Sequence, residues 1–301
     1  MSTASTAPAK TGAGSAAGPR CHVHAAQPAV RQCTNCGQAF CEACMRERTE
    51  ARAHAESCPS CRGFCRSLEA SGPQRPRSMA EMVSDAIAYP LRGSGFGLIL
   101  LGAVFFVLID MLSRSWRYGL FFSIFGAGYL SAYMLETVNG GANGKKEPQD
   151  WPEFANVWDS VALPFLQMAT VWLVCLAPAA LPFLVSGITQ GSVFAASAIA
   201  IVTSLYVPMA ILALALNNSV AAIGPSVVVP AILAVPWQYL AVWGVLAAAG
   251  ALSALFQAFV ASAIPILGLA VNTLVSLYLL SVEMRLVGLL YLVNSKRLKL
   301  V

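Results

Sequence analysis

The sequence has few charged residues, and a long part of it has none. Asp, Glu, Lys and Arg make up 11% of the 301 residues, against roughly a quarter in soluble globular domains. Residues 160–282 contain none of the four. An ionisable side chain at the centre of a membrane helix costs about 2.5–3.5 kcal/mol. This composition excludes a single water-soluble domain and, with a mean hydropathy of +0.66, disorder over most of the length.

Histidine is also absent from most of the chain, since none follows His54. Histidine-dependent intramembrane proteolysis, histidine metal sites and histidine haem ligation are therefore excluded from the apolar part. Ion-coupled transporters generally keep carboxylates in their pathway, and residues 160–282 offer none. The first twenty residues lack the apolar stretch of about 7–15 residues that a secretory signal needs, so we expect residues 1–20 to form a disordered tail.

Cysteine, in contrast, is concentrated near the N-terminus, where eight of the nine lie between Cys21 and Cys65. A C-x2-C or C-x2-H pair directs two soft donors at one ion, and two such pairs complete a tetrahedral Zn²⁺ shell. Disulfides would need an oxidising compartment, iron–sulfur sites use other spacings, and catalytic zinc would keep an open position. The spacing therefore predicts two structural zinc ions. The ligands are Cys21, His24, Cys33, Cys36, Cys41, Cys44, Cys58 and Cys61.

The order of these ligands resembles the B-box type of zinc finger, and more closely its short bacterial form, over residues 21–65. The matching segments are CHVH (21–24), PAV (28–30), CTNC (33–36), CEAC (41–44) and CPSC (58–61). In such cross-brace folds the first and third pairs share one ion, and the second and fourth share the other.

The resemblance therefore implies two ligand sets. Site 1 consists of Cys21, His24, Cys41 and Cys44, and site 2 of Cys33, Cys36, Cys58 and Cys61. The eukaryotic family often uses histidine near the last positions, so His54 is an alternative ligand for Cys58 or Cys61. We expect His22 at the surface and Cys65 as a spare thiol. The resemblance also implies protein binding rather than catalysis. A ubiquitin-ligase role is disfavoured because the sequence has no second Cys/His cluster.

The remaining sequence predicts a mainly α-helical, polytopic membrane bundle of about six spans, since about 20 apolar residues cross the hydrocarbon core. The predicted spans are Phe96–Leu112, Tyr118–Leu135, Val161–Val185, Val193–Leu216, Gln238–Ala261 and Ile264–Val293. Residues 217–238 are apolar but contain three prolines, so we expect them to lie in the interface or to dip into it. The short first pair of spans could instead form a re-entrant hairpin.

The predicted domains are thus a tail (1–20), a small cross-brace zinc module (21–66), a linker with an interfacial helix (67–92) and a transmembrane domain (93–301). Four segments of the last two parts are similar to a bacterial multi-span membrane family of unknown function, which is also seen fused to B-box-like heads. They are YPLRG (89–93), GYLSAYM (128–134), EPQDWPEF (147–154) and VEMRLVGLLY (282–291). This resemblance implies an architecture and no reaction.

Zinc thiolates belong in the reducing cytosol, so we expect a cytoplasmic N-terminus in an inner membrane. An even number of spans then places the C-terminus in the cytoplasm too. The basic residues at 145–146 and 296–299 agree with the positive-inside rule, whereas Arg114 and Arg117 do not.

Two polar features in the apolar part need explanation. The loop at 144–158, which carries Trp151 and Trp158, is expected to anchor the next span, or to dock a partner or the protein's own basic segments. Glu283 and Arg285 lie inside the last span, and residues two apart on a helix do not face each other. We therefore expect Arg285 to pair with Glu136.

These features predict a non-enzymatic, membrane-anchored adaptor whose zinc module binds a cytosolic protein and whose bundle anchors it in the lipid bilayer or joins a homo-oligomer. The alternative is a transporter or lipid-handling protein with a regulatory zinc finger, because proline-broken helices can line a site. Nucleic-acid binding is not expected, since acidic residues interleave with the arginines of the module between positions 42 and 66.

Overall fold

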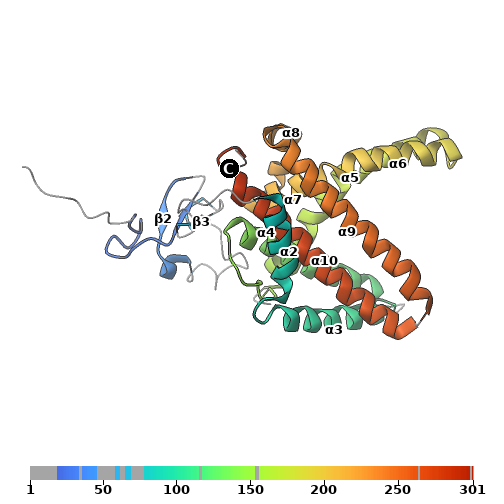
Figure 1. The fold of residues 1–301 in the computed structure, drawn as a ribbon, viewed down its shortest axis with the longest axis horizontal. Coiled ribbons are helices and arrows are strands. Elements are labelled where there is room, and N and C mark those ends of the chain that lie inside the picture. Colours follow the sequence, from blue (N-terminus) through green and yellow to red (C-terminus); the bar gives the residue numbers. More distant parts are fainter. Residues whose placement is uncertain are drawn as a thin grey trace, which may run out of the picture.

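The computed structural model describes residues 19–33, 36–45, 58–61, 65–68, 78–114, 117–152, 156–263, 265–298 and 300. Within these ranges the chain is mainly helical, with a small β-containing part at its N-terminal end (Figure 1). We call described residues 19–68 the Cys/His module and described residues 78–300 the helical body. The predicted tail up to residue 18, residues 69–77 of the linker and His54 lie outside the described residues.

The Cys/His module contains a three-stranded antiparallel sheet with the order β2-β1-β3. Strand β1 (Arg31–Cys33) pairs on one side with β2 (Ala39–Phe40) and on the other with β3 (Cys65–Ser67), which places Cys33 opposite Cys65. Apart from cysteines, the buried apolar residues in the described part of the module are Ala39, Phe40 and Met45. Three apolar side chains supply little hydrophobic stabilisation, and modules of this size commonly depend on bound metal to fold.

The helical body begins with α2 (Met79–Ala88), whose first turn is capped by Ser78 and Glu81 in a reciprocal capping box. The first half of the body continues with η2 (Tyr89–Leu91), α3 (Gly95–Ser113), α4 (Gly119–Ala142), the π-helical turn η3 (Trp158–Ala162) and α5 (Leu163–Ser186). The second half contains α6 (Gln190–Ser204), α7 (Val207–Asn217), η4 (Val220–Ile223), α8 (Pro225–Ala234), α9 (Pro236–Ala263) and α10 (Pro265–Asn294).

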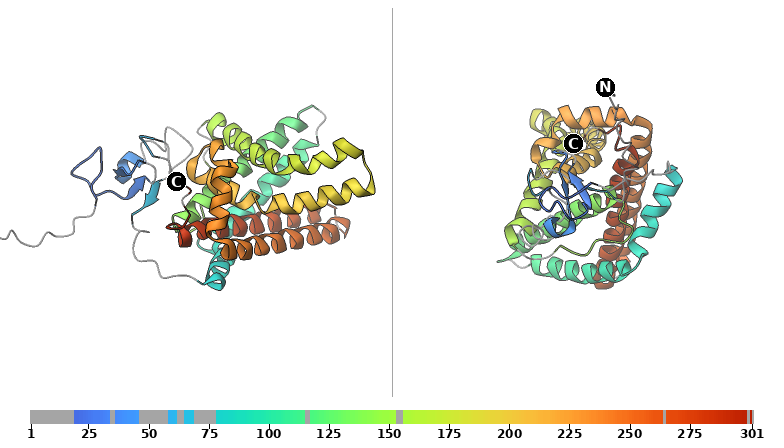
Figure 2. Two further views of the ribbon diagram at one scale, coloured as in Figure 1. Left: turned by 90° about the horizontal axis from the view of Figure 1, so that it is seen from above. Right: turned by 90° about the vertical axis from the view of Figure 1, so that its left-hand side faces the viewer.

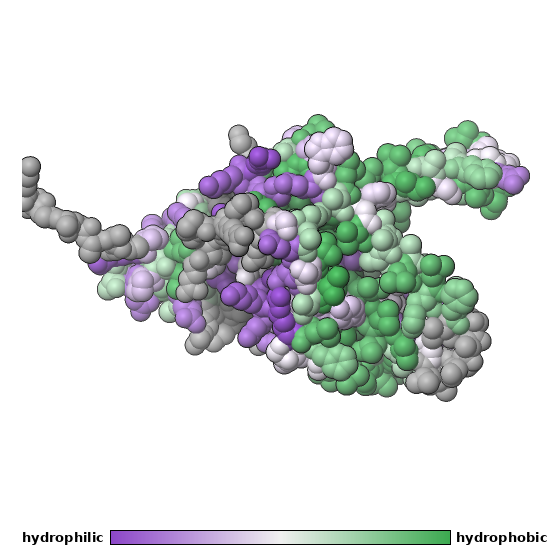
Figure 3. Space-filling view, viewed as in Figure 1, coloured by the Kyte–Doolittle hydropathy of each residue, from purple (hydrophilic) through white to green (hydrophobic). Residues whose placement is uncertain are grey.

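The buried core of the body lies near the Cys/His module and not at the middle of the helices. Helix α7 is buried from Pro208 to Leu216, and the C-terminal halves of α4 and α10 pack around it together with Met82 and Ala86 of α2. Beyond this core, α3, the α5–α6 hairpin and the α9–α10 hairpin extend in the direction away from the Cys/His module (Figures 1 and 2). Their surface is apolar, whereas hydrophilic residues gather toward the module (Figure 3), which is the distribution expected of a protein embedded in a bilayer at one end.

Four helical stretches in the described part of the chain are long and apolar enough to cross a membrane: Gly95–Ser113, Trp158–Ser186, Pro236–Phe259 and Gly268–Asn294. Helices α6 and α7 make a fifth if they are counted as one span bent by 41°. The six predicted spans are therefore not confirmed. Helix α4 occupies the second predicted span, but its C-terminal half is largely buried inside the protein and it carries Glu136 and several hydroxyl-bearing side chains.

Helices α4 and α10 cross at two glycines. A Cβ atom on Gly288 would lie 2.4 Å from the carbonyl oxygen of Val138 and 2.7 Å from the Cα of Gly141. Close approach through small residues is a common way for helices to pack in membranes, because lipid offers no hydrophobic drive for association. The crossing brings the C-terminal parts of α4 and α10 together.

The pairing of Arg285 with Glu136 is wrong. Arg285 is 1% exposed and donates from Nη2 and Nε to Asp85 of α2, at 3.1 and 3.3 Å. Its guanidinium also lies 4.5 Å from the centroid of the Tyr89 ring, a cation–π distance. Asp85 accepts from Arg92 as well, at 2.6 Å. The expected partner was misplaced because α2 does not lie apart from the bundle but packs directly on α10.

Candidate metal centres

The structure brings the eight predicted ligands together as two clusters. Within each cluster the four ligand atoms lie within 4.8 Å of one another. The clusters are Cys21, His24, Cys41 and Cys44, and Cys33, Cys36, Cys58 and Cys61, which are the sets that the B-box resemblance implies for sites 1 and 2. Each cluster could hold one metal ion.

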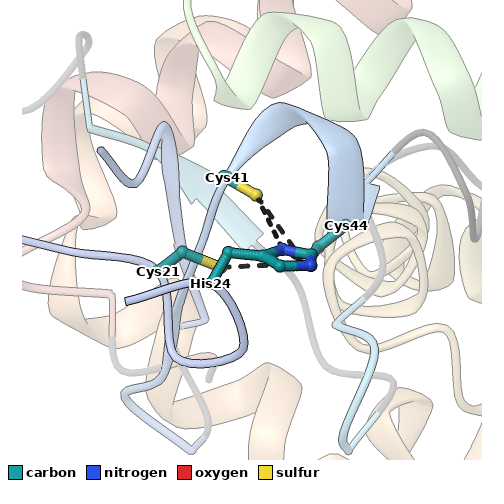
Figure 4. A group of neighbouring side chains, drawn as sticks. All are labelled: Cys21, His24, Cys41 and Cys44. Carbon is teal, nitrogen blue, oxygen red and sulfur yellow. Dashed lines mark hydrogen bonds between the residues drawn. The ribbon is translucent and has the colours of Figure 1, made fainter. Parts of the chain in front are cut away.

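At site 1 the imidazole of His24 faces the thiols through Nδ1 (Figure 4). Nδ1 lies 3.2 Å from the sulfur of Cys44 and 3.5 Å from that of Cys41, and the Cys44 sulfur lies 3.7 Å from those of Cys21 and Cys41. The three cysteines are buried and His24 is exposed, so the cluster lies just below the surface with one side reachable from solvent.

At site 2 the sulfur–sulfur distances are 3.5 Å between Cys33 and Cys61 and 3.6 Å between Cys36 and Cys58. Cys33 and Cys58 are buried, whereas Cys36 and Cys61 are exposed. All of these separations are far longer than a sulfur–sulfur bond of about 2.05 Å, and the nine cysteines of the chain are free thiols.

These distances fit a tetrahedral zinc ion. With Zn–S bonds of about 2.3 Å and Zn–N bonds of about 2.0–2.1 Å, a regular tetrahedron separates two sulfurs by about 3.8 Å and a sulfur and a nitrogen by about 3.5 Å. The sulfur–sulfur separations of 3.5–3.7 Å and the sulfur–nitrogen separations of 3.2–3.5 Å are close to these values. Four protein donors at each cluster complete the shell, which is typical of structural and not catalytic zinc.

Backbone hydrogen bonds help to hold Cys33 and Cys36, the second of the four ligand pairs, close together. The amide of Cys36 donates to the sulfur of Cys33 at 3.4 Å, and the amide of Gly37 donates to the carbonyl of Cys33 at 3.1 Å. Gly37 has a φ of +72°, in the left-handed region that favours glycine. The spacing of the ligands does not predict this role for Gly37, although the pattern C-x-x-C-G contains the signal.

Site 1 already differs from a set of ordinary thiols. Burial opposes ionisation of Cys21, but hydrogen bonds from the backbone at His24, Cys41 and Val23 outweigh it and lower the pKa of the thiol to about 6. Burial raises the pKa of Cys44 to about 12, and the neighbouring thiols Cys21 and Cys41 contribute. Adjacent thiolates repel one another, so ionisation of the whole set requires a cation among them.

The other cysteine and histidine predictions have separate outcomes. Cys65 lies in neither cluster; it is fully buried, and burial raises the pKa of its thiol well above the ordinary range. His22 is exposed, and its Nε2 lies 3.2 Å from the side-chain amide nitrogen of Gln38. The alternative ligand His54 lies outside the described residues, so the structure leaves that prediction open.

The comparisons with known proteins return nothing for this chain: no protein-family model, curated protein or solved structure matches it. The B-box resemblance and the resemblance to the membrane family therefore stay predictions. What the structure itself shows is two Cys/His clusters able to bind metal, attached to an apolar helical region.

The loop between α4 and η3 packs on the helical body through its first tryptophan. The indole nitrogen of Trp151 donates to the carbonyl of Leu98 at 2.9 Å, and its ring stacks 4.4 Å from that of Tyr133. A Cβ on Gly102 would lie 2.1 Å from the ring, so glycine is needed there. The backbone amide of Gln149 donates to the hydroxyl of Tyr89 at 3.1 Å. Trp158 is 58% exposed, and the interfacial anchoring expected of this loop stays a prediction.

Proposed function

We propose that this protein is a membrane-anchored zinc-finger adaptor: the Cys/His module binds two Zn²⁺ ions and recognises a second protein, and the helical body holds the module at the membrane. The observation that carries the proposal is the pair of closed four-donor clusters in one small module at one end of an apolar bundle. Closed sites stabilise a binding surface and leave no coordination position for a substrate. On this proposal the protein is not an enzyme.

Zinc is the ion we propose because the donors are three thiols with one imidazole, or four thiols, at tetrahedral separations. Such sets select Zn²⁺ or iron–sulfur chemistry, and the C-x2-C spacing is that of zinc modules. We expect two zinc ions per chain by elemental analysis of the purified protein. Replacing Cys36 and Cys61 by serine is expected to leave one.

We propose further that the module and the C-terminal segment face the cytoplasm of a bacterial inner membrane. Arg66 of β3 lies 3.4 Å from the hydroxyl of Ser295, so the two segments are on the same side of the bundle. The exposed Lys296 and Arg297 follow directly, as the positive-inside rule expects. At the other end of the bundle, Arg114 pairs with Asp110 at 2.8 Å, so Arg114 is weaker evidence against this orientation.

The decisive experiment compares the proteins that the wild type and a Cys33→Ser/Cys36→Ser variant label or capture in cells. The matched control is Cys175→Ser, which removes a buried thiol of α5 outside the module. We expect the site 2 variant to remain in the membrane at normal abundance but to lose specific partners that the control retains. Recovery of the same partners by all three proteins would refute the adaptor role.

The rival function, transport or lipid handling, draws on two observations: α6 and α7 are bent by 41°, and α5 contains Pro178 and Pro182. The groove of about 600 Å³ between α4 and α5 speaks against transport of a polar solute, because it is open and lined by apolar side chains such as Trp172. Its one hydroxyl, Ser131, donates to the carbonyl of Ala127. Such a groove suits an acyl chain better than a polar solute.

A further inference from the structure

Strand β3 joins the Cys/His module to the helical body. The amide of Ser67 donates to the side-chain oxygen of Asn143 at 3.1 Å, and Asn143 is the C-cap residue of α4 and is 4% exposed. One residue earlier, Nη1 of Arg66 lies 3.4 Å from the hydroxyl of Ser295, directly after α10. The module is thus seated on the ends of the two helices that form the core of the body.

The direction of the Ser67 amide shows that this contact is separate from the sheet. Successive amides of a strand point to opposite sides, and the next amide, that of Leu68, donates to the carbonyl of Val30 beside β1 at 2.9 Å. The Ser67 amide therefore points away from β1 and toward α4. Protection of the Ser67 amide from hydrogen exchange therefore reports docking on α4, whereas protection of the Leu68 amide reports the sheet.

Site 2 lies at the other end of the same strand pair. Cys33 is the last residue of β1, and its cross-strand partner is Cys65, the first residue of β3. Cys61 precedes β3 by only four residues. An ion held by Cys33, Cys36, Cys58 and Cys61 ties the end of β1 to the segment that enters β3. Site 1 has no such connection, because its ligands flank β2 and the segment before β1.

We propose that the ion at site 2 positions β3 and so couples metal occupancy to the docking of the module on α4 and α10. Loss of this ion frees β3 from α4, whereas loss of the ion at site 1 leaves the docked contact in place. The inference rests on the metal binding proposed above and not on the adaptor role, and it adds a regulatory connection between the module and the membrane helices.

The test measures amide hydrogen exchange at residue resolution in the full-length protein in detergent or nanodiscs. The site 2 variant is Cys36→Ser/Cys61→Ser, and the matched site 1 variant is His24→Ala/Cys44→Ser. We expect exchange of the Ser67 amide to rise at least about 10-fold in the first and less than about 2-fold in the second. Equal effects of the two variants, or no effect of the first, overturn the proposal.

A second measurement remains decisive if the ligand variants unfold the module. Asn143→Ala keeps all eight ligands but removes the acceptor of the Ser67 amide. Coupling between two sites is reciprocal, so loss of one hydrogen bond should weaken zinc binding at site 2 about 2- to 10-fold in chelator competition. The control is Asn139→Ala, one turn earlier on α4, whose side-chain oxygen has no hydrogen-bond partner among the described residues.

An unchanged zinc affinity in Asn143→Ala, or an equal loss in Asn139→Ala, contradicts the coupling. Failure of the proposed function gives a different result: the wild type then binds fewer than two zinc ions, or its partners do not depend on them. If the wild type holds two zinc ions but the exchange rate of the Ser67 amide is the same in the site 2 variant, only the coupling is refuted.

Discussion

Removal of the Asp85 carboxylate should destabilise the protein strongly, because it leaves the buried Arg285 guanidinium without its counter-charge. Arg285 is 1% exposed, and its Nε and Nη2 atoms both donate to the carboxylate of Asp85, at 3.3 and 3.1 Å. Breaking one partner of a buried ion pair costs about 3–5 kcal/mol. Asp85 is 18% exposed and Tyr89 still faces the guanidinium, so we expect about 3 kcal/mol for Asp85→Ala.

The assay is a double-mutant cycle of Asp85→Ala and Arg285→Met, read by thermal or denaturant unfolding in one detergent. Methionine keeps an unbranched apolar stem without the charge, so the double variant should lose less stability than the two single variants together. We expect a coupling energy of about 2 kcal/mol. For domains of 150–250 residues this corresponds to about 4–8 °C in Tm. Glu136→Gln combined with Arg285→Met is the control and should be additive.

The pH dependence of the same variant gives an independent check. Burial opposes the charge of Asp85, but Arg92 and Arg285 outweigh it and lower the pKa of its carboxyl below the ordinary value. A lowered pKa in the folded state adds stability above the unfolded pKa of about 3.9, and this contribution is lost as the pH falls through the folded value. The stability difference between wild type and Asp85→Ala should be constant from pH 5 to 8 and shrink only below about pH 4. In the double-mutant cycles, additive effects of Asp85→Ala and Arg285→Met together with coupled effects of Glu136→Gln and Arg285→Met would refute the assignment of Asp85 as the partner of Arg285.

Three further predictions concern the metal sites and the helix crossing. Zinc affinity should decrease as the pH is lowered, and more steeply below about pH 6. The reason is that the metal-free Cys44 thiol is protonated at neutral pH, and Cys21, with a pKa of about 6, becomes protonated as well below that pH. Chelator competition between pH 5.5 and 8 measures this, and an affinity that does not change with pH contradicts it. Gly37→Ala forces a side chain into a φ of +72°, so we expect zinc binding at site 2 to weaken about 5-fold, while site 1 is unchanged. Gly288→Ala should cost at least about 1–3 kcal/mol in unfolding experiments because its Cβ meets Val138 and Gly141, whereas Gly250→Ala, with nothing within 4 Å of the new atom, should be close to neutral.

Most of the metal centres could be predicted from the sequence because the chemistry is local. A C-x2-C pair needs only one turn to direct two sulfurs at one point, and the four pairs between Cys21 and Cys61 specify eight donors without knowledge of the fold. The division into sites 1 and 2 is long-range and came from a resemblance. The role of Gly37 depends on a positive φ, and its signal in the sequence is the glycine that directly follows Cys36.

The helical body shows the opposite balance. Hydropathy places the helices well: the predicted span Phe96–Leu112 corresponds to α3 (Gly95–Ser113), and Gln238–Ala261 to α9 (Pro236–Ala263). It does not distinguish a helix that faces lipid from one that faces protein, since both are apolar. For this reason hydropathy did not predict that α7, part of the expected span Val193–Leu216, is buried in the protein from Pro208 to Leu216. For Arg285, the partner was expected on α4 but lies on α2.

The contact between Asp85 and Arg285 joins residues 200 positions apart, and this separation has a consequence for how the protein is made. At a synthesis rate of about 5–20 residues per second, α2 waits about 10–40 s for α10 to be translated. During that interval Asp85 lacks its contact with Arg285 and α2 lacks its packing on α10, while the cysteines of the module have already left the ribosome. Metal loading can thus precede membrane assembly, and the core of the body closes only after its last helix is inserted.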